Sequence, residues 1–356
     1  MKHILKILIL PVLLGVVLAT PGRASAGIFQ KLSSDSIATW GKFPRFCMKI
    51  YDWGDEFFNG YDSLYVSRTH TNFNVRVNAD SWADLYNFDL PEDKQIRMRT
   101  DPATSMGFSL GYLAVSVGYD MNVSRYFGGP NRTRKRFNFG FTCSLLSFEY
   151  YDIHNDGDVH ITRFGSGGEA ANLHLPFKGI DTHTRGADIY LFFNQKRYSM
   201  AAAFNYGRYQ LRSAGSFFAG FSYFHNAYHF DFSELPEAMR DELPTSWEDY
   251  SYNVNTNNYC LKLGYGYNWV LGKHWLIGIS ESPVLGLQQG RITGNAKPTS
   301  MSLSNRLRIS FVWNNKHWFA GVIGRADQGL IYNKKQAFIN SDLSFNACFG
   351  YRFNLW

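Results

Sequence analysis

The stretch Asp342–Trp356, D-L-S-F-N-A-C-F-G-Y-R-F-N-L-W, alternates apolar and polar side chains over fifteen residues. A repeat of two residues is the pattern of a β-strand with one apolar and one polar face. Ordinary strands hold about five to six residues, whereas a tilted strand that crosses a membrane holds about 9–11. The stretch therefore predicts the closing strand of a transmembrane antiparallel β-barrel, with lipid on its apolar face and the lumen on its polar face.

At least ten other stretches repeat this alternation, so an up-and-down barrel over 61–356 accounts for most of the chain. The segments 73–79 and 259–269 are clear examples, and Leu113-Ala114 marks a tight turn. All strand-like runs together number about thirteen. An odd number of strands would leave the first and the last residue of the barrel segment on opposite sides of the membrane. Reading 198–224 as one long strand kinked near Gly207 gives about twelve, the count we favour. A further strand within 226–250 would give about fourteen.

The connections are expected to be of two kinds. Short turns and both termini would lie in the periplasm, and long loops outside the cell at 124–136, 165–185, 225–251 and 290–300. Asn155–Asp158 predicts a hairpin turn, because Asp-Gly supplies the positive φ of a primed turn. A calcium loop is not expected there, since Arg163 stands where the last acidic ligand belongs.

Three expected short turns place a basic residue shortly before an aromatic one. They are Lys196-Arg197-Tyr198, Lys273-His274-Trp275 and Lys316-His317-Trp318. A basic residue at head-group level next to an interfacial aromatic ring is typical of a membrane edge. Lys196, Lys273 and Lys316 are therefore candidate interfacial turn residues.

The beginning of the chain predicts export. After two lysines in the first six residues come the apolar run Ile7–Leu18 and the small-x-small site Ala24–Ala26. This order is typical of a secretory signal peptide, and the run is shorter than the about 20 residues of a membrane anchor. We expect a signal peptide over 1–26 and, for an exported barrel, a place in the outer membrane of a Gram-negative bacterium.

Residues 27–60 are expected to form a leader and a short amphipathic helix. From Pro44 to Phe58 the period changes, and the apolar residues are spaced four, three and four apart, at Phe46, Ile50, Trp53 and Phe57. That spacing gives one apolar stripe on a helix, which Asn59-Gly60 would end. The helix would pack on the periplasmic mouth of the barrel, or serve as an interfacial helix or plug.

Composition excludes several classes of protein. After the signal, no apolar run is long enough to cross a membrane as a helix. Aromatic residues make up 17% of the chain, and a membrane barrel uses such residues on its outer wall and in two interfacial girdles. The net charge is +7, but three basic residues lie in the signal, so the excess is weak and does not predict nucleic-acid binding.

Motifs for chemistry are scarce. The sequence contains no phosphate-binding loop, HExxH motif, CxxC pair or nucleophile elbow. His225 and His229 lie four apart beside Asp231, but at the end of an aromatic strand we interpret them as interfacial or solvated residues. We therefore expect no catalytic residues, cofactor or metal site.

The polar faces of the strands contain arginines among small residues. The candidates for lining the lumen are Arg76, Arg306, Arg308 and Arg352, because an Arg on the lipid face costs about 2–4 kcal/mol at mid-bilayer. In an open lumen they would favour anions or carboxylates. Alternatively, they pair with inward acids such as Asp120 and Asp342 and merely fill the barrel.

Five runs are more specific than the alternation. They are Y-D-S-L-Y-V (61–66), N-Q-K-R-Y-S-M-A-A-A-F (194–204), S-A-G-S-F-F-A-G-F-S-Y (213–223), G-Y-G-Y-N-W-V (264–270) and G-Y-R-F-N-L-W (350–356). The chain resembles in these runs an uncharacterised family of exported Bacteroidota proteins, the domain of unknown function 4421. The resemblance runs from about Trp40 to the end and implies an outer-membrane barrel of the same architecture. It carries no catalytic residue across.

For function, we expect a channel or small-solute transport barrel with a polar, basic lumen and a solute that the sequence does not name. Two alternatives stay open. One is a surface-structural or adhesive barrel with a filled lumen, whose loop 225–251 meets a partner; the other is an envelope-lipid-modifying enzyme. The expected partners are outer-membrane lipid, lipopolysaccharide and the barrel-assembly machinery, which would meet the C-terminal strand.

Overall fold

The computed structural model describes residues 56–113, 115–124, 132–157, 159–166, 171–293, 299–333 and 336–354. From Phe58 onward these residues belong to one compact unit. The predicted signal peptide over 1–26 lies outside the described residues, and so does nearly all of the leader and helix expected over 27–60. No helix in the described part of the chain is long and apolar enough to cross a membrane.

Twelve antiparallel strands form a closed up-and-down barrel, which confirms the predicted fold class and strand number. Each strand pairs with the next one in the ring, and β17 pairs with β2 from Phe353↔Phe73 to Ala337↔Asp89, which closes the ring. The ring consists of β2 (Phe73–Asp89), β4 (Ala103–Tyr112), β5 (Val115–Asn122), β6 (Arg132–Thr142), β7 (Leu146–Gly157), β10 (Ile180–Phe192), β12 (Ala214–Asp231), β13 (Ser251–Val270), β14 (Trp275–Ile292), β15 (Thr299–Asn314), β16 (Trp318–Asn333) and β17 (Gln336–Phe353).

Five further strands lie outside the ring. β3 (Lys94–Arg99) pairs with the last residues of β2 and continues through β8 (Val159–Ser166) to β9 (Ala171–Phe177). β1 (Val66–Arg68) and β11 (Arg208–Gln210) form a small sheet of their own.

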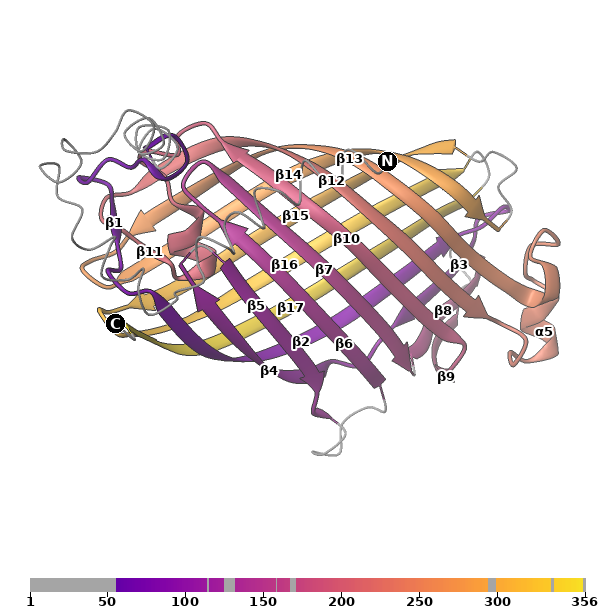
Figure 1. Ribbon diagram of the computed structural model, residues 1–356. Helices are drawn as coiled ribbons and strands as arrows, with labels where there is room; N and C mark the ends of the chain where they lie inside the picture. The colour runs from indigo at the N-terminus through magenta and orange to yellow at the C-terminus, as the bar shows by residue number, and fades with distance from the viewer. Residues whose placement is uncertain are drawn as a thin grey trace, which may run out of the picture. The chain divides into compact units, whose positions relative to one another are not determined.

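The two ends of the barrel differ in their connections (Figure 1). At the short-turn end, strands are joined by tight turns, such as the one between Tyr112 and Val115, and β1, β11 and the π-helix η2 (Ala201–Asn205) also lie there. At the loop end lie the β3–β8–β9 sheet, α5 (Glu237–Arg240) and the 3-10 helix η3 (Glu248–Tyr250).

Four details of the predicted layout are wrong. Residues 198–224 are not one kinked strand, because 201–205 form a π-helix, with Ala201–Ala203 buried, before β12 begins at Ala214. Asn155–Asp158 is not a hairpin turn, since β8 leaves β7 to pair with β3. The loop expected at 225–251 is shorter, because β12 runs on to Asp231.

The loop expected at 165–185 is also largely strand. It contains the end of β8, the whole of β9 and the start of β10. These residues are strands because β8 and β9 extend the sheet that begins with β3, instead of closing a loop over the ring.

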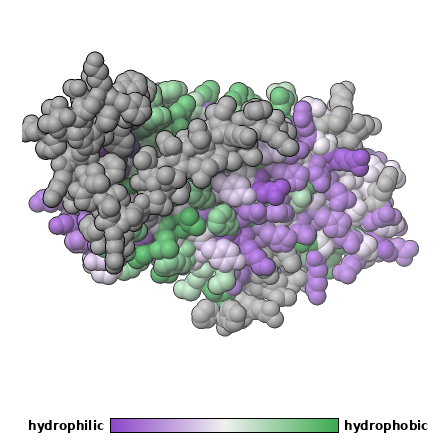
Figure 2. Space-filling model, in the orientation of Figure 1, coloured by the Kyte–Doolittle hydropathy of each residue, from purple (hydrophilic) through white to green (hydrophobic). Residues whose placement is uncertain are grey.

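The polarity of the inward-facing and outward-facing side chains reverses along the strands, as β13 shows most clearly. Near the short-turn end, outward residues such as Leu261, 67% exposed, are apolar and their inward neighbours are polar. Nearer the loop end, Asn253 and Asn255 are exposed, and the alternate residues Tyr252 and Val254 are buried. On the face that Figure 2 shows, hydrophobic residues gather towards the short-turn end and hydrophilic ones over the loop end. The first zone is the apolar belt of a membrane barrel, and the second is a water-facing β-structure with a core of its own.

Candidate functional site: the sealed lumen

A hydrophobic core, here called the cap, fills the lumen at the loop end. It contains twenty buried residues, which come from seven strands of the ring (β2, β10, β12, β13, β14, β16 and β17), from the β3–β8–β9 sheet with the turn that leads into it, and from the loop 232–250. The ring of Phe88 on β2 lies 5.3 Å from that of Phe230 on β12 and 5.0 Å from that of Tyr252 on β13. Because β2 and β12 stand opposite each other in the ring of strands, these contacts close the lumen across its width.

The connection 193–213, here called the plug, folds into the lumen at the short-turn end. Its Tyr198 and Tyr206 are 1% and 2% exposed. Inward side chains of the wall hold its backbone carbonyls: Asn268 Nδ2 donates to Ser199 at 2.9 Å, and Arg352 Nη2 donates to Tyr206.

Inward glycines make room for the plug. A Cβ on Gly266 would lie 2.4 Å from Tyr198 Oη, and one on Gly321 would lie 2.7 Å from the Tyr206 ring. Part of the space that the small inward residues leave is therefore occupied by the plug.

Between the cap and the plug, a buried carboxylate gathers two cations. Asp188 on β10 accepts hydrogen bonds from Lys262 Nζ at 2.9 Å and from Arg306 Nη1 at 2.6 Å, and from Ser222 Oγ. The hydroxyl of Tyr190 accepts from Lys262 at 3.0 Å and from Arg306 at 2.9 Å. Since Arg306 comes from β15, this network ties two well-separated parts of the wall together across the lumen.

A second cluster surrounds Glu149 on β7. Arg136 and Arg308 each place a guanidinium nitrogen 3.7 Å from a different oxygen of this carboxylate. With Arg76 and Arg325 they line a cavity of about 110 Å³, next to a larger lumen cavity of about 210 Å³. The Nε atoms of Arg76, Arg136 and Arg325 have no partner among the described protein atoms. Guanidinium donors in such an arrangement can bind water or a small anion such as phosphate or a carboxylate.

All four arginines singled out from the sequence lie on inward faces, but in three different settings. Arg306 pairs with Asp188 and, through Nε at 3.1 Å, with Asp327. Arg308 and Arg76 line the smaller cavity. Arg352 is 2% exposed and lies away from both cavities, against the plug and 4.4 Å above the Phe319 ring.

The three predicted turn lysines are exposed at the short-turn end. Lys273 and Lys316 lie in tight turns, whereas Lys196 lies in the turn with which the plug begins. His225 and His229 contact the amide oxygens of Asn257 and Asn253. In the described part of the chain, no group of three His, Cys, Asp or Glu side chains is placed to hold a metal ion.

The sequence reasoning missed the residues at the centre of both clusters, although the signal was present. Asp188 and Tyr190 alternate with the apolar Ile189 and Leu191, and Lys262 alternates with Leu261 and Leu263. Their strand phase therefore marks them as inward, just as it marks the arginines. The alternation along a strand does not show which inward charges from distant strands contact each other.

Residues 60–353 match the family described as Domain of unknown function (DUF4421). The chain belongs to this family. No curated protein matches this DUF4421 chain. Among solved structures it is similar to the outer membrane protease OmpT from Escherichia coli, at 8% identity and a TM-score of 0.38 over 81% of this chain and 98% of that one.

Two other solved structures are similar to a comparable extent. The translocator domain of the autotransporter NalP from Neisseria meningitidis is 12% identical, with a TM-score of 0.34 over 90% of this chain and 98% of that one. The P. putida toluene transporter TodX is 9% identical, with a TM-score of 0.29 over 85% and 98%. Similarity at these levels carries no function over to this DUF4421 barrel.

Proposed function

We propose that the protein is an outer-membrane barrel with a closed lumen and that it works through the head that it holds at its loop end. The head comprises β3, β8, β9, the loop 232–250 and the loop-end parts of the barrel strands that contribute to the cap. Of the functions expected from the sequence, the surface-structural or adhesive one therefore fits the geometry best.

The cap is the observation that carries this proposal. Burial of one large apolar side chain contributes about 1.5–3 kcal/mol, and twenty residues are buried together here. Separating them would cost on the order of tens of kcal/mol, which thermal motion or the binding of a small solute does not supply. A solute path through this end is therefore closed, whatever the plug does.

The loop 232–250 is anchored to the cap and exposes acidic residues. Leu235, Leu243 and Trp247 are buried in the cap and anchor the loop. Five acidic residues of the loop are exposed, namely Glu234, Glu237, Asp241, Glu242 and Asp249. A loop that is anchored in this way offers a fixed acidic surface to a partner at little cost in ordering.

Anion transport through a gated lumen is the second candidate, and the arginine-lined cavities favour it. It would require both the cap and the plug to move. The charges of the lumen weigh against it, since Asp188 and Glu149 already pair with four of the inward cations.

Conductance in planar bilayers tests the proposal. The closed barrel is expected to give no steps, and the variant Tyr198→Ala/Tyr206→Gly, with a weakened plug, is expected to stay silent because the cap remains. Insertion is verified in the same samples by heat-modifiable migration on gels. Anion-favouring steps from the unaltered protein would overturn the closed-lumen proposal and support transport.

A further inference from the structure

The apolar belt is interrupted by a carboxylate on its lipid-facing side. Glu281 lies on the outward face of β14, is exposed, and stands midway along the strand between Trp275 and Leu287. Its neighbours across the sheet are Tyr265 and Leu307. Ionisable residues at this depth in a membrane are rare and usually serve a function, because hydrocarbon offers them no partner.

Asn305 on β15 is the polar neighbour of Glu281. Its Nδ2 donates a hydrogen bond to Glu281 Oε1 at 3.2 Å. A primary amide has a second N–H, and a carboxylate can accept several hydrogen bonds. The pair therefore presents both a donor and an acceptor to whatever lies against this wall.

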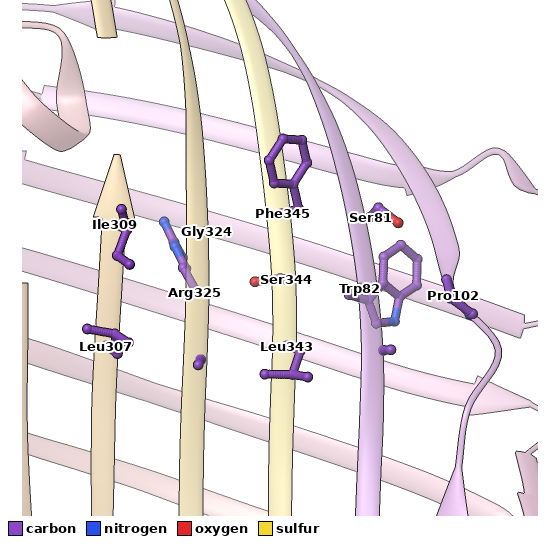
Figure 3. Close-up of a pocket in the computed structure, with 12 residues that line it drawn as sticks. Ser81, Trp82, Pro102, Leu307, Ile309, Gly324, Arg325, Leu343, Ser344 and Phe345 are labelled. Atoms are coloured by element: carbon purple, nitrogen blue, oxygen red, sulfur yellow. The ribbon is translucent and has the colours of Figure 1, made fainter. Parts of the chain in front are cut away.

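The wall beside this pair is hollowed. A groove of about 380 Å³ runs over β15, β16, β17 and β2, and Figure 3 shows Leu307, Ile309, Leu343 and Phe345 around it. Gly324 lies in the groove, and a Cβ added there would meet nothing within 4 Å. Small residues in a lipid-facing wall allow the close approach of another membrane-embedded surface.

We propose that this wall, from Glu281 and Asn305 to the Gly324 groove, is the interface with a second copy of the same chain. Two copies that share a membrane in the same orientation are related by an axis along the membrane normal, so equal residues lie at equal depth. Glu281 of each copy can then accept from Asn305 of the partner subunit, which is the reciprocal contact of a twofold interface.

A lipid does not meet the same requirements. An acyl chain can fill the groove, but it adds no donor to the one that Asn305 of the same chain already gives the carboxylate, and head groups lie at the membrane surface rather than at the depth of Glu281. A second copy supplies both the donor and the filling surface.

Self-association in detergent tests the interface. The unaltered chain is expected to sediment as a dimer, and Glu281→Leu and Gly324→Leu are expected to weaken dimerisation by about tenfold or more. Leu110→Ala is the matched control, since Leu110 is also exposed in the belt but lies on β4, four strands from β15 around the ring, and it should dimerise normally. Both replacements at the interface put apolar side chains on a lipid-facing wall, so folding is expected to persist, as heat-modifiable migration will show.

Cross-linking in membranes gives a second readout. A cysteine at Leu307 should form a disulfide between copies under mild oxidation, whereas one at Phe108, in the belt on β4, should not. The unsubstituted chain measures the background from the native cysteines. A protein that is monomeric at every concentration, or equal cross-linking at the two positions, would overturn the proposal.

Discussion

Arg352, on the inward face of the closing strand β17, donates a hydrogen bond to the backbone carbonyl of Tyr206 in the plug. The same guanidinium donates to Asn314 Oδ1 at 2.7 Å and to the carbonyl of Asn315 at 3.0 Å. The strand that closes the barrel therefore also fixes the plug and the neighbouring turn, so closure of the wall and plugging of the lumen are coupled.

Replacing Arg352 by Ser should loosen the plug without preventing assembly. The change removes three hydrogen bonds from a charged donor at a site that is 2% exposed, and each such bond contributes about 1.5–3 kcal/mol. We expect a loss of about 4–5 kcal/mol in the free energy of unfolding, the lower end of that sum, and faster cleavage of the plug by protease added from the short-turn side.

Phe345→Arg is the control for the facing of β17. Phe345 is 52% exposed on the lipid-facing side, where Arg costs about 2–4 kcal/mol. Phe345→Arg should therefore fail to insert into the membrane. Urea titration, with folding followed by heat-modifiable migration on gels, compares Phe345→Arg with Arg352→Ser. Similar behaviour of the two variants would contradict the inward facing of Arg352.

Asp188→Asn should lower the free energy of unfolding more than the loss of one partner cation does. The substitution leaves Lys262 and Arg306 buried beside a neutral amide, and breaking a buried ion pair in this way costs about 3–5 kcal/mol. The double variant Asp188→Asn/Lys262→Met removes one of the stranded charges and should recover part of the loss. A double-mutant cycle on the free energy of unfolding measures this coupling, and strict additivity would contradict the network described here.

The barrel was predictable because alternation with a period of two needs only neighbouring residues. The same alternation placed Arg352 on the inward face and holds equally for Lys262, but it does not show that one contacts a plug and the other a carboxylate on β10. Those contacts join residues far apart in the sequence, such as Tyr206 and Arg352, and depend on how the ring closes.

The plug and the cap were missed for two different physical reasons. Residues 198–206 alternate as a strand would, yet Ala201–Ala203 are small and favour helical backbone, so a π-helix fits the space inside the wall. The cap was missed because the predicted strand covered only 73–79, whereas β2 continues to Asp89 and its inward face changes from Arg76 and Asn78 to the buried Tyr86 and Phe88.

Phe230→Ala should destabilise the head far more than Phe217→Ala destabilises the belt, although both residues lie on β12. Phe230 is fully buried in the cap and Phe217 is 67% exposed on the outer wall. Loss of a buried Phe costs about 3–5 kcal/mol. Hydrogen exchange of β3 and of the loop 232–250 should therefore rise in the first variant and stay unchanged in the second; equal effects would argue against a packed cap.

The entry to the loop 232–250 should depend on acidity. The hydroxyl and the backbone N–H of Ser233 hydrogen-bond to the carboxylate of Asp231 and hold the pKa of this group below its ordinary value of 3.8. A lowered pKa in the folded state contributes stability above pH 3.8 that is lost as the pH falls through the folded value. In the unaltered protein, pepsin should begin to cut the loop only when the pH falls below the folded-state pKa of Asp231. In Asp231→Ala, which lacks the carboxylate, the rate of cutting should not change at that pH.

Gly321→Leu should displace the plug, because a Cβ at this inward position would lie 2.7 Å from the Tyr206 ring. Overpacking of this kind costs about 1–3 kcal/mol. Gly324→Leu, on the same strand but facing outward into open space, is the matched control and should leave the free energy of unfolding unchanged when all chains are measured at concentrations at which they are monomeric. Adding Tyr206→Gly to Gly321→Leu removes the ring that is in the way, and glycine suits the left-handed backbone at 206, where φ is 60°. The double variant should therefore be more stable than the sum of the two single effects predicts, as urea titration of all four chains will measure. Equal losses from Gly321→Leu and Gly324→Leu would mean that the plug does not occupy the lumen in the membrane.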